Sequence, residues 1–143
     1  MSQYKRKVEI IMSVLASKRE ESAVQFLDNA IDLHVYTLKN CTGFPKRYMF
    51  FITKGIVDLS KECLNCVKAA NSIYPKNEHE LQMRRDYFIR ANACVQNLYT
   101  HIDIAKNTFP IEDKKIIEWI RILREEERLI KGVMKSDSKN FKF

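Results

Sequence analysis

The sequence predicts an all-α protein: an antiparallel, up-and-down four-helix bundle with a short extra N-terminal helix. The chain has 143 residues, which is the size of a single domain, and 45% of them are hydrophobic, enough for a core. Only 3 glycines and 3 prolines occur, fewer than the turns of a β-sandwich or barrel require. Long stretches repeat apolar residues every three or four positions, which is typical of amphipathic helices.

Residues 1–17 form a predicted N-terminal extension. A short helix at 4–16 would place four apolar residues on one face: Val8, Ile11, Met12 and Leu15. Basic residues before an apolar run resemble a signal peptide, but Glu9 and Ser13 interrupt the run. No run approaches the ~18 apolar residues that cross a membrane, so we expect no membrane span and a cytoplasmic protein.

Prolines in polar surroundings divide the rest of the chain into helices. Gly43-Phe44-Pro45 predicts the end of one helix and the start of the next, because glycine suits a helix C-terminus and proline a first turn. Asn77 is a predicted N-cap with Glu80 as its capping-box partner. The predicted bundle covers 18–136 and precedes a disordered tail at 137–143. Short connections favour antiparallel packing of its four helices, 18–41, 45–73, 78–107 and 112–136.

The second helix carries a heptad seam in which apolar residues alternate by three and four. The seam consists of Met49, Ile52, Ile56, Leu59, Cys63, Cys66, Ala70 and Ile73. The predicted core face of the first helix consists of Ala23, Leu27, Ala30, Ile31 and Leu38. Arg84 is a polar seam member of the third helix, and Glu126-Glu127 interrupt the fourth. This suggests a buried ion pair of Arg84 with Glu126 or Glu127, near one end of the bundle or across a subunit contact. Further apolar residues beside the seams indicate homo-oligomerisation.

Cys63-x-x-Cys66 is the one spacing that resembles a metal or redox motif. A zinc site needs four ligands, usually on loops, whereas both cysteines fall on the helical seam and no second Cys or His pair has a matching spacing. Buried, reduced cysteine is the preferred interpretation. No nucleophile elbow or phosphate loop occurs. We therefore predict no enzyme activity, no catalytic residue, no metal ligand and no cofactor.

Basic residues recur every seven positions along the second helix: Arg47, Lys54, Lys61 and Lys68. They fall opposite the seam and form a predicted basic ridge, with ~10 Å between successive charges at ~1.5 Å rise per residue. From Phe44 to Lys76 there are six basic and two acidic residues, a stronger bias than a solvated helix face usually has. Together with the net charge of +7, the ridge indicates a nucleic-acid partner contacted through phosphates. An ordinary solvated face is the alternative.

A second basic set, Arg84, Arg85 and Arg90, lies near Tyr87 and Phe88 on the third helix. Arginine next to an aromatic ring can stack on exposed bases, and Arg84 and Arg85 are the candidate nucleic-acid contacts of this set. Packing of the two aromatic residues at a helix interface is the alternative.

Several of these segments resemble one four-helix-bundle family. It includes the accessory variability determinant of diversity-generating retroelements and the proteins encoded in ribosomal RNA intervening sequences. The resemblance covers roughly residues 20–136. Its most similar segments are Gly43-Phe44-Pro45-Lys46-Arg47-Tyr48, residues 69–75, Met83-Arg84-Arg85-Asp86-Tyr87-Phe88 and residues 129–135. Residues 61–67 depart from the Asn-Ile-Ala-Glu-Gly-like segment of the intervening-sequence branch, so the chain is more similar to the accessory proteins.

The resemblance implies a basic homo-oligomer, a pentameric ring in the accessory proteins. It implies a reverse transcriptase and its RNA or DNA as partners, and a role in mutagenic reverse transcription without chemistry of its own. The matching basic positions are Arg47, Lys54, Lys61, Arg84 and Arg85.

Three hypotheses follow. The first is a non-catalytic accessory protein that binds nucleic acid and a reverse transcriptase, with binding that weakens when Lys54 and Lys61 become Glu. The second is a structural or regulatory homo-oligomer that binds only protein. The third is a bundle enzyme or metal protein that uses Cys63, Cys66 and a histidine.

Overall fold

Four long helices make up the computed structural model, which describes residue 6 and residues 22–143. They are α2 (Ser22–Cys41), α3 (Lys54–Ser72), α4 (Glu78–Thr108) and α5 (Asp113–Asn140). Two short segments connect α2 to α3: η1 (Lys46–Tyr48), a 3-10 turn, and η2 (Met49–Thr53), a π-helical turn. No strand occurs in the described residues, so the predicted all-helical class is confirmed. The predicted extension at 1–17 lies outside them, apart from Arg6.

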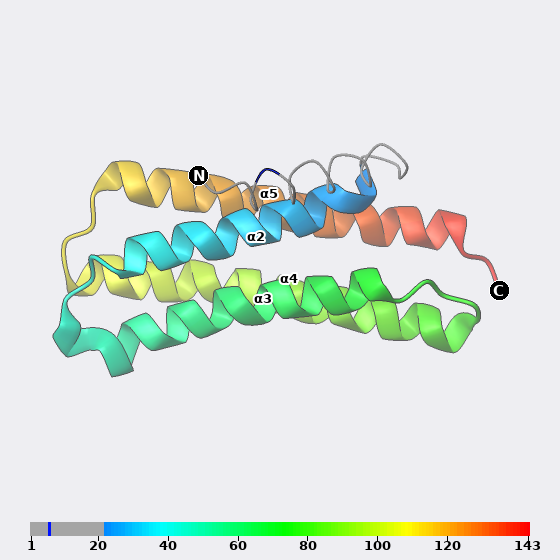
Figure 1. The fold of residues 1–143 in the computed structure, drawn as a ribbon, viewed down its shortest axis with the longest axis horizontal. Coiled ribbons are helices and arrows are strands. Elements are labelled where there is room, and N and C mark those ends of the chain that lie inside the picture. Colours follow the sequence, from blue (N-terminus) through cyan, green and yellow to red (C-terminus); the bar gives the residue numbers. More distant parts are fainter. Residues whose placement is uncertain (1–5, 7–21) are drawn as a thin grey trace.

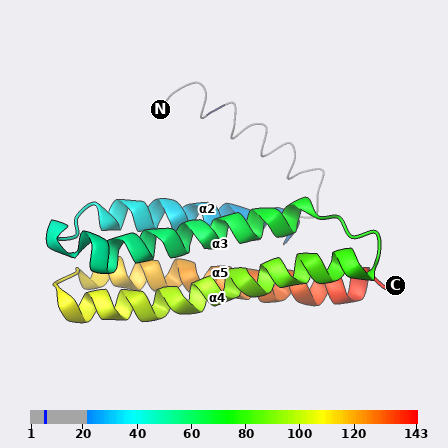
Figure 2. The same ribbon diagram turned by 90° about the horizontal axis from the view of Figure 1, so that it is seen from below.

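The four helices lie side by side along one axis (Figure 1). Seen at right angles, α2 and α3 form one layer over α4 and α5 (Figure 2). The α2–α3 and α4–α5 connections lie at one end of the bundle, and the α3–α4 connection lies at the other. Within residues 22–143, no helix combines the length and the apolar character that crossing a membrane requires.

The core fills the space between the two layers. Trp119 is its largest fully buried side chain, and its indole Nε1 donates a 3.0 Å hydrogen bond to Thr37 Oγ1. The Thr37 hydroxyl in turn donates to the Leu33 carbonyl, so the buried polar atoms of both side chains have partners. Other fully buried apolar side chains come from all four helices, and each such burial is worth roughly 1.5–3 kcal/mol: Phe26, Leu33, Ile56, Val67, Phe88, Leu98, Leu123 and Ile130.

The start of α4 has the predicted cap. The side-chain oxygen of Asn77 accepts a 2.9 Å hydrogen bond from the backbone N–H of Glu80. The Glu80 carboxylate reaches back to the backbone N–H of Lys76, 3.2 Å away. The first contact satisfies a donor that the helix N-terminus leaves free, and the second ties the residue before the cap to the first turn, so the boundary predicted from Asn77 and Glu80 is confirmed.

The predicted core face of α2 is wrong in part. Ile31 and Leu38 were expected in the seam, but they are 39% and 41% exposed. The buried positions are instead Phe26, Leu33 and Thr37, with Leu27 and Ala30 shared by both patterns. Apolar residues occur on more than one side of this helix, so periodicity alone selected a stripe rotated away from the true core.

The predicted seam of the second helix is also wrong at its start. Met49 is 43% exposed, whereas Thr53, which was not a seam member, is buried. The cause is η2, because a π-helical turn holds one residue more than an α-turn and shifts the phase of everything before it. From Ile56 onward Cys63, Cys66 and Ala70 are buried as predicted, whereas Leu59 and Ile73 are only half-buried and Ser60 and Val67, outside the predicted seam, are fully buried.

The tail predicted as disordered at 137–143 is helical in its first part. Helix α5 continues to Asn140, and Asp137 is buried. The physical reason is tertiary: Asp137 pairs with Arg84 of α4, which holds the last turns of α5 against the bundle.

Candidate nucleic-acid interface

Three lysines of the predicted basic ridge lie on the outward face of α3. Lys54, Lys61 and Lys68 are all exposed, while the opposite face of the helix buries Ile56 and Val67. Seven residues are just under two helical turns, so the three side chains follow one line along the bundle at intervals of ~10 Å. The structure therefore brings these predicted residues together on one surface.

Arg47 is exposed, but it does not lie on α3. It belongs to η1, and its guanidinium carbon lies 5.0 Å from the centre of the Tyr48 ring. The π-helical turn between Arg47 and Lys54 changes the phase that the seven-residue spacing assumed. The predicted four-residue ridge on one helix is thus corrected to three lysines on α3 with Arg47 on the turn before it.

Carboxylates offset only part of this charge. Asp58 accepts from Lys54 at 2.7 Å, and Glu62 pairs with Arg90 of α4 at 3.4 Å, so both acidic residues of α3 have cationic partners. Among residues 22–143, no ion pair includes Arg47, Lys61 or Lys68. Their positive charge faces solvent and is available to an anion.

Lys61 also acts on a neighbouring histidine of α2. His34 lies beside α3, and its Nδ1 is 2.7 Å from Ser60 Oγ. Partial burial, and then the positive charge of Lys61, lower the pKa of His34 below its usual value. The α3 surface therefore carries its charge through lysine rather than through histidine.

Arg84 does not belong to an exposed basic set, contrary to the sequence-based interpretation. Its side chain is 12% exposed and forms a two-point ion pair with Asp137, with 2.7 Å from Nε to Oδ2 and 3.2 Å from Nη2 to Oδ1. Its Nη1 donates to the backbone carbonyls of Ala70 and Ile73. The predicted partner was Glu126 or Glu127, but Asp137 takes that place. Arg84 stabilises the fold and is not accessible to a nucleic acid.

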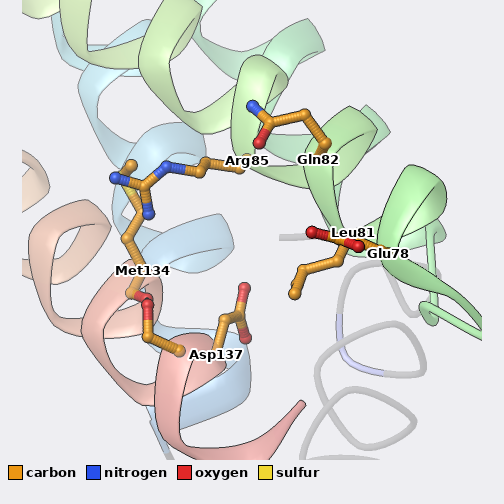
Figure 3. Close-up of a pocket in the computed structure, with 7 residues that line it drawn as sticks. Glu78, Leu81, Gln82, Arg85, Met134 and Asp137 are labelled. Atoms are coloured by element: carbon orange, nitrogen blue, oxygen red, sulfur yellow. The ribbon is translucent and has the colours of Figure 1, made fainter. Parts of the chain in front are cut away.

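Arg85 is exposed at a different place from the α3 lysines. Figure 3 shows it reaching from α4 toward Met134 of α5, over a small hollow that Glu78 and Asp137 also line. The hollow measures about 140 Å³, smaller than the pockets of about 300 Å³ or more that hold small ligands. All residues that line this hollow belong to α4 and α5, so the Arg85 side chain lies along α5 rather than along the α3 lysines.

The cysteine motif lies inside the bundle. Cys63 and Cys66 are 0% and 3% exposed, and both are free thiols. Burial raises the pKa of Cys63 well above its usual range and that of Cys66 to about 11, where a hydrogen bond to Glu62 adds to the shift. Both thiols are therefore held protonated, unlike a metal ligand or nucleophile. In the part of the chain that the structure describes, no three His, Cys, Asp or Glu side chains gather as a metal site would need.

The sequence pattern missed two exposed aromatic side chains at the α2–α3 corner. Phe50 and Phe51 in η2 are 84% and 86% exposed, next to Arg47. A signal was present: residues 49–52 are four apolar residues in a row, which is more than one face of a helix can bury.

Comparisons with known proteins add no relative. No family model, no curated protein and no solved structure matches this chain.

Proposed function

We propose that this chain is an antiparallel, up-and-down bundle that binds nucleic acid without catalysing a reaction, through the exposed basic residues of α3 and η1. The observation that carries the proposal is the line formed by Lys61 and Lys68, with Arg47 and Lys54 before it. All four side chains are exposed. Three of them have no carboxylate partner among the described residues.

The chemistry of the surface favours phosphate contacts over base recognition. Lysines spaced by ~10 Å along a straight helix present point charges, and they offer no paired donors and acceptors for base edges. Binding of this kind releases counterions and weakens steeply as the salt concentration rises. The proposal therefore expects salt-dependent binding with little sequence preference.

The experiment compares wild type with the double variant Lys61→Glu, Lys68→Glu. Lys68 is a better choice than Lys54, because Asp58 already pairs with Lys54. Fluorescence anisotropy with labelled RNA and DNA, between about 50 and 200 mM salt, gives the affinity and its salt dependence. We expect at least tenfold weaker binding. The slope of the logarithm of the binding constant against the logarithm of the salt concentration should become smaller in magnitude by about two.

A matched control carries the same charge change on another helix. Lys135→Glu with Lys139→Glu on α5 also lowers the net charge of +7 by four, and both side chains are exposed. The control is expected to lose less affinity than the α3 variant. Equal losses would reduce the effect to net charge, and unchanged binding of the α3 variant would refute the α3 surface as the site.

A second candidate function is a structural or regulatory homo-oligomer that binds only protein. One observation favours it: Ile31, Val35 and Leu38 are 39%, 42% and 41% exposed along the outer side of α2. Exposed apolar side chains in a row are typical of protein interfaces. Two results together would favour this function over the first. Wild type would bind no RNA or DNA at low salt, and the Val35→Glu variant would dissociate an oligomer that wild type forms.

The wider role is an accessory function beside a reverse transcriptase, in a pentameric ring. Support for the ring and for the reverse transcriptase comes from the sequence resemblance. A light-scattering mass tests the ring, and a search of the neighbouring genes for a reverse transcriptase, followed by a pull-down with that enzyme, tests the partner; both are separate from nucleic-acid binding.

A further inference from the structure

The corner between α2 and α3 carries the two most exposed large apolar side chains among the described residues. Phe50 and Phe51 are 84% and 86% exposed, and Met49 beside them is 43% exposed. In Figure 1 this corner stands out from the end of the bundle, in teal at the lower left. Leaving two phenyl rings in water is unfavourable by ~25 cal/mol for each Å² of apolar surface, which indicates a contact that the single chain does not make.

The backbone on both sides of the two rings is fixed to the core. Before them, the Tyr48 ring stacks on Phe109 with 5.2 Å between ring centres, and Phe44 packs edge-on against Phe109 at 4.8 Å. After them, Thr53 is buried at 3% exposure. The π-helical turn between these anchors directs both phenyl rings outward. A partner therefore meets rings that are already positioned, which lowers the entropy lost on binding.

The surroundings of the rings are entirely cationic in sequence. No acidic residue occurs between Asp32 and Asp58, whereas four basic residues do: Lys39, Lys46, Arg47 and Lys54. Arg47 and Lys54 lie within about one helical turn of Phe50, and both are exposed. The corner thus combines flat aromatic surface with positive charge.

We propose that Phe50 and Phe51 are a stacking platform for unpaired bases, so that this protein prefers single-stranded nucleic acid to duplex. The inference rests on the proposed function and adds the class of nucleic acid. An unpaired base offers a π face to each ring while its phosphates meet Arg47, which has no carboxylate partner among the described residues, so one ligand satisfies both features of the corner. Bases inside a duplex are already stacked and cannot reach the rings.

Two other occupants fit the corner less well. A second protein chain would have to desolvate the flanking charges, and the cores of protein interfaces are depleted in lysine. A membrane surface is typically bound by a long apolar helix face, whereas here the chain returns to the buried Thr53 two residues after Phe51. Both occupants are outcomes of the test below.

The test compares wild type with Phe50→Leu, Phe51→Leu and with Phe50→Tyr, Phe51→Tyr. Leucine keeps the apolar surface but removes the π face, and tyrosine keeps the π face. Anisotropy is measured with labelled oligothymidylate, oligouridylate and a mixed-sequence duplex of equal length. We expect the leucine variant to bind the single strands roughly tenfold more weakly or worse, with duplex binding unchanged, and the tyrosine variant to behave like wild type.

A control places the same kind of change at the other end of the bundle. Tyr74 is 77% exposed at the α3–α4 connection, and Tyr74→Leu is expected to leave single-strand affinity unchanged. Circular dichroism melting checks that each variant is folded. Sedimentation with anionic phospholipid vesicles tests binding to a membrane, and light scattering tests association with a second copy of the chain.

The outcomes separate this inference from the function on which it rests. Wild type that binds neither single strand nor duplex overturns both. Wild type that binds both, with a leucine variant that loses nothing, overturns the stacking platform and leaves the α3 surface in place. A further variant, Phe50→Ala with Phe51→Ala, removes the apolar surface as well as the π face. If it abolishes vesicle binding and the leucine variant does not, the corner binds a membrane. If it abolishes self-association and the leucine variant does not, the corner binds a second copy of the chain.

Discussion

The Arg84 guanidinium and the Asp137 carboxylate form a two-point ion pair that joins the start of α4 to the end of α5. The Nε to Oδ2 distance is 2.7 Å, and each side chain is only 12% exposed. The same guanidinium donates to the carbonyls of Ala70 and Ile73 at the end of α3. One side chain thus connects the ends of three helices, because it supplies a donor to the Ile73 carbonyl and a second donor to the Ala70 carbonyl, which also accepts from the Ile73 N–H.

Removing the acidic partner is expected to destabilise the bundle. Asp137→Ala leaves the Arg84 charge nearly buried and unpaired, which costs about 3 kcal/mol, the low end for a buried pair because some solvent reaches it. Urea unfolding followed by Trp119 fluorescence measures this loss, and Asp137→Asn, which keeps an acceptor, is expected to lose less.

The exposed pair of Arg121 and Glu118 on α5 provides the control. Its side chains are 64% and 41% exposed, so water screens the interaction and Glu118→Ala is expected to leave the urea midpoint nearly unchanged. Equal effects of Asp137→Ala and Glu118→Ala would contradict a structural role for the Arg84–Asp137 pair.

Glu126 makes the stability of the fold depend on pH. It is fully buried in α5, where burial raises its pKa to about 8 from the usual 4.5, despite a 3.2 Å hydrogen bond from the Asn29 amide. Between these two pH values the unfolded chain releases a proton that the folded chain keeps. The contribution of Glu126 to stability is therefore fully present below about pH 4.5 and is lost as the pH rises to about 8, a change on the order of 4 kcal/mol.

Glu126→Gln removes this titration while keeping the size of the side chain. Urea unfolding of wild type and variant at a series of pH values between 5 and 8.5 gives the free energy of unfolding of each protein as a function of pH, and the slopes of the two curves are compared. Taking the difference cancels His34, whose lowered pKa acts in the opposite direction. Parallel pH profiles for the two proteins would show that Glu126 is ionised in the folded state.

Local signals in the sequence predicted the start of α4 correctly. Asn77 and Glu80 sit at the start of α4 with the predicted contacts, because a cap involves residues only a few positions apart. The α3 lysines were also placed correctly, since a seven-residue spacing on a helix needs no knowledge of the other helices.

The features that were missed depend on distant parts of the chain. Asp137 extends α5 because Arg84 lies opposite it, 53 residues earlier in the sequence. Glu126 was expected in a buried ion pair with Arg84, but it is buried without that partner and accepts a hydrogen bond from Asn29, 97 residues away. The π-helical turn at η2 fits a corner that Tyr48 and Phe109 hold together, so the exposure of Phe50 and Phe51 could not be derived from periodicity.

The cysteines offer a direct test of the alternative in which the protein binds a metal or acts through a thiol. Burial raises the pKa of Cys41 to about 12 and that of Cys66 to about 11, and it raises the pKa values of Cys63 and Cys94 as well. At neutral pH even the Cys66 thiolate is roughly a hundredfold rarer than that of an ordinary cysteine. We expect Ellman's reagent to modify the four thiols only when urea unfolds the protein.

Lys68→Cys supplies the positive control, because it puts an exposed thiol on the same helix as Cys63 and Cys66. This variant is expected to release one equivalent of the coloured thiolate rapidly from the folded protein, and wild type none. Zinc added beforehand should change neither result, since the thiols of Cys63 and Cys66 are buried and protonated. Rapid modification of two thiols in folded wild type, prevented by zinc, would instead identify Cys63 and Cys66 as an accessible metal-binding pair.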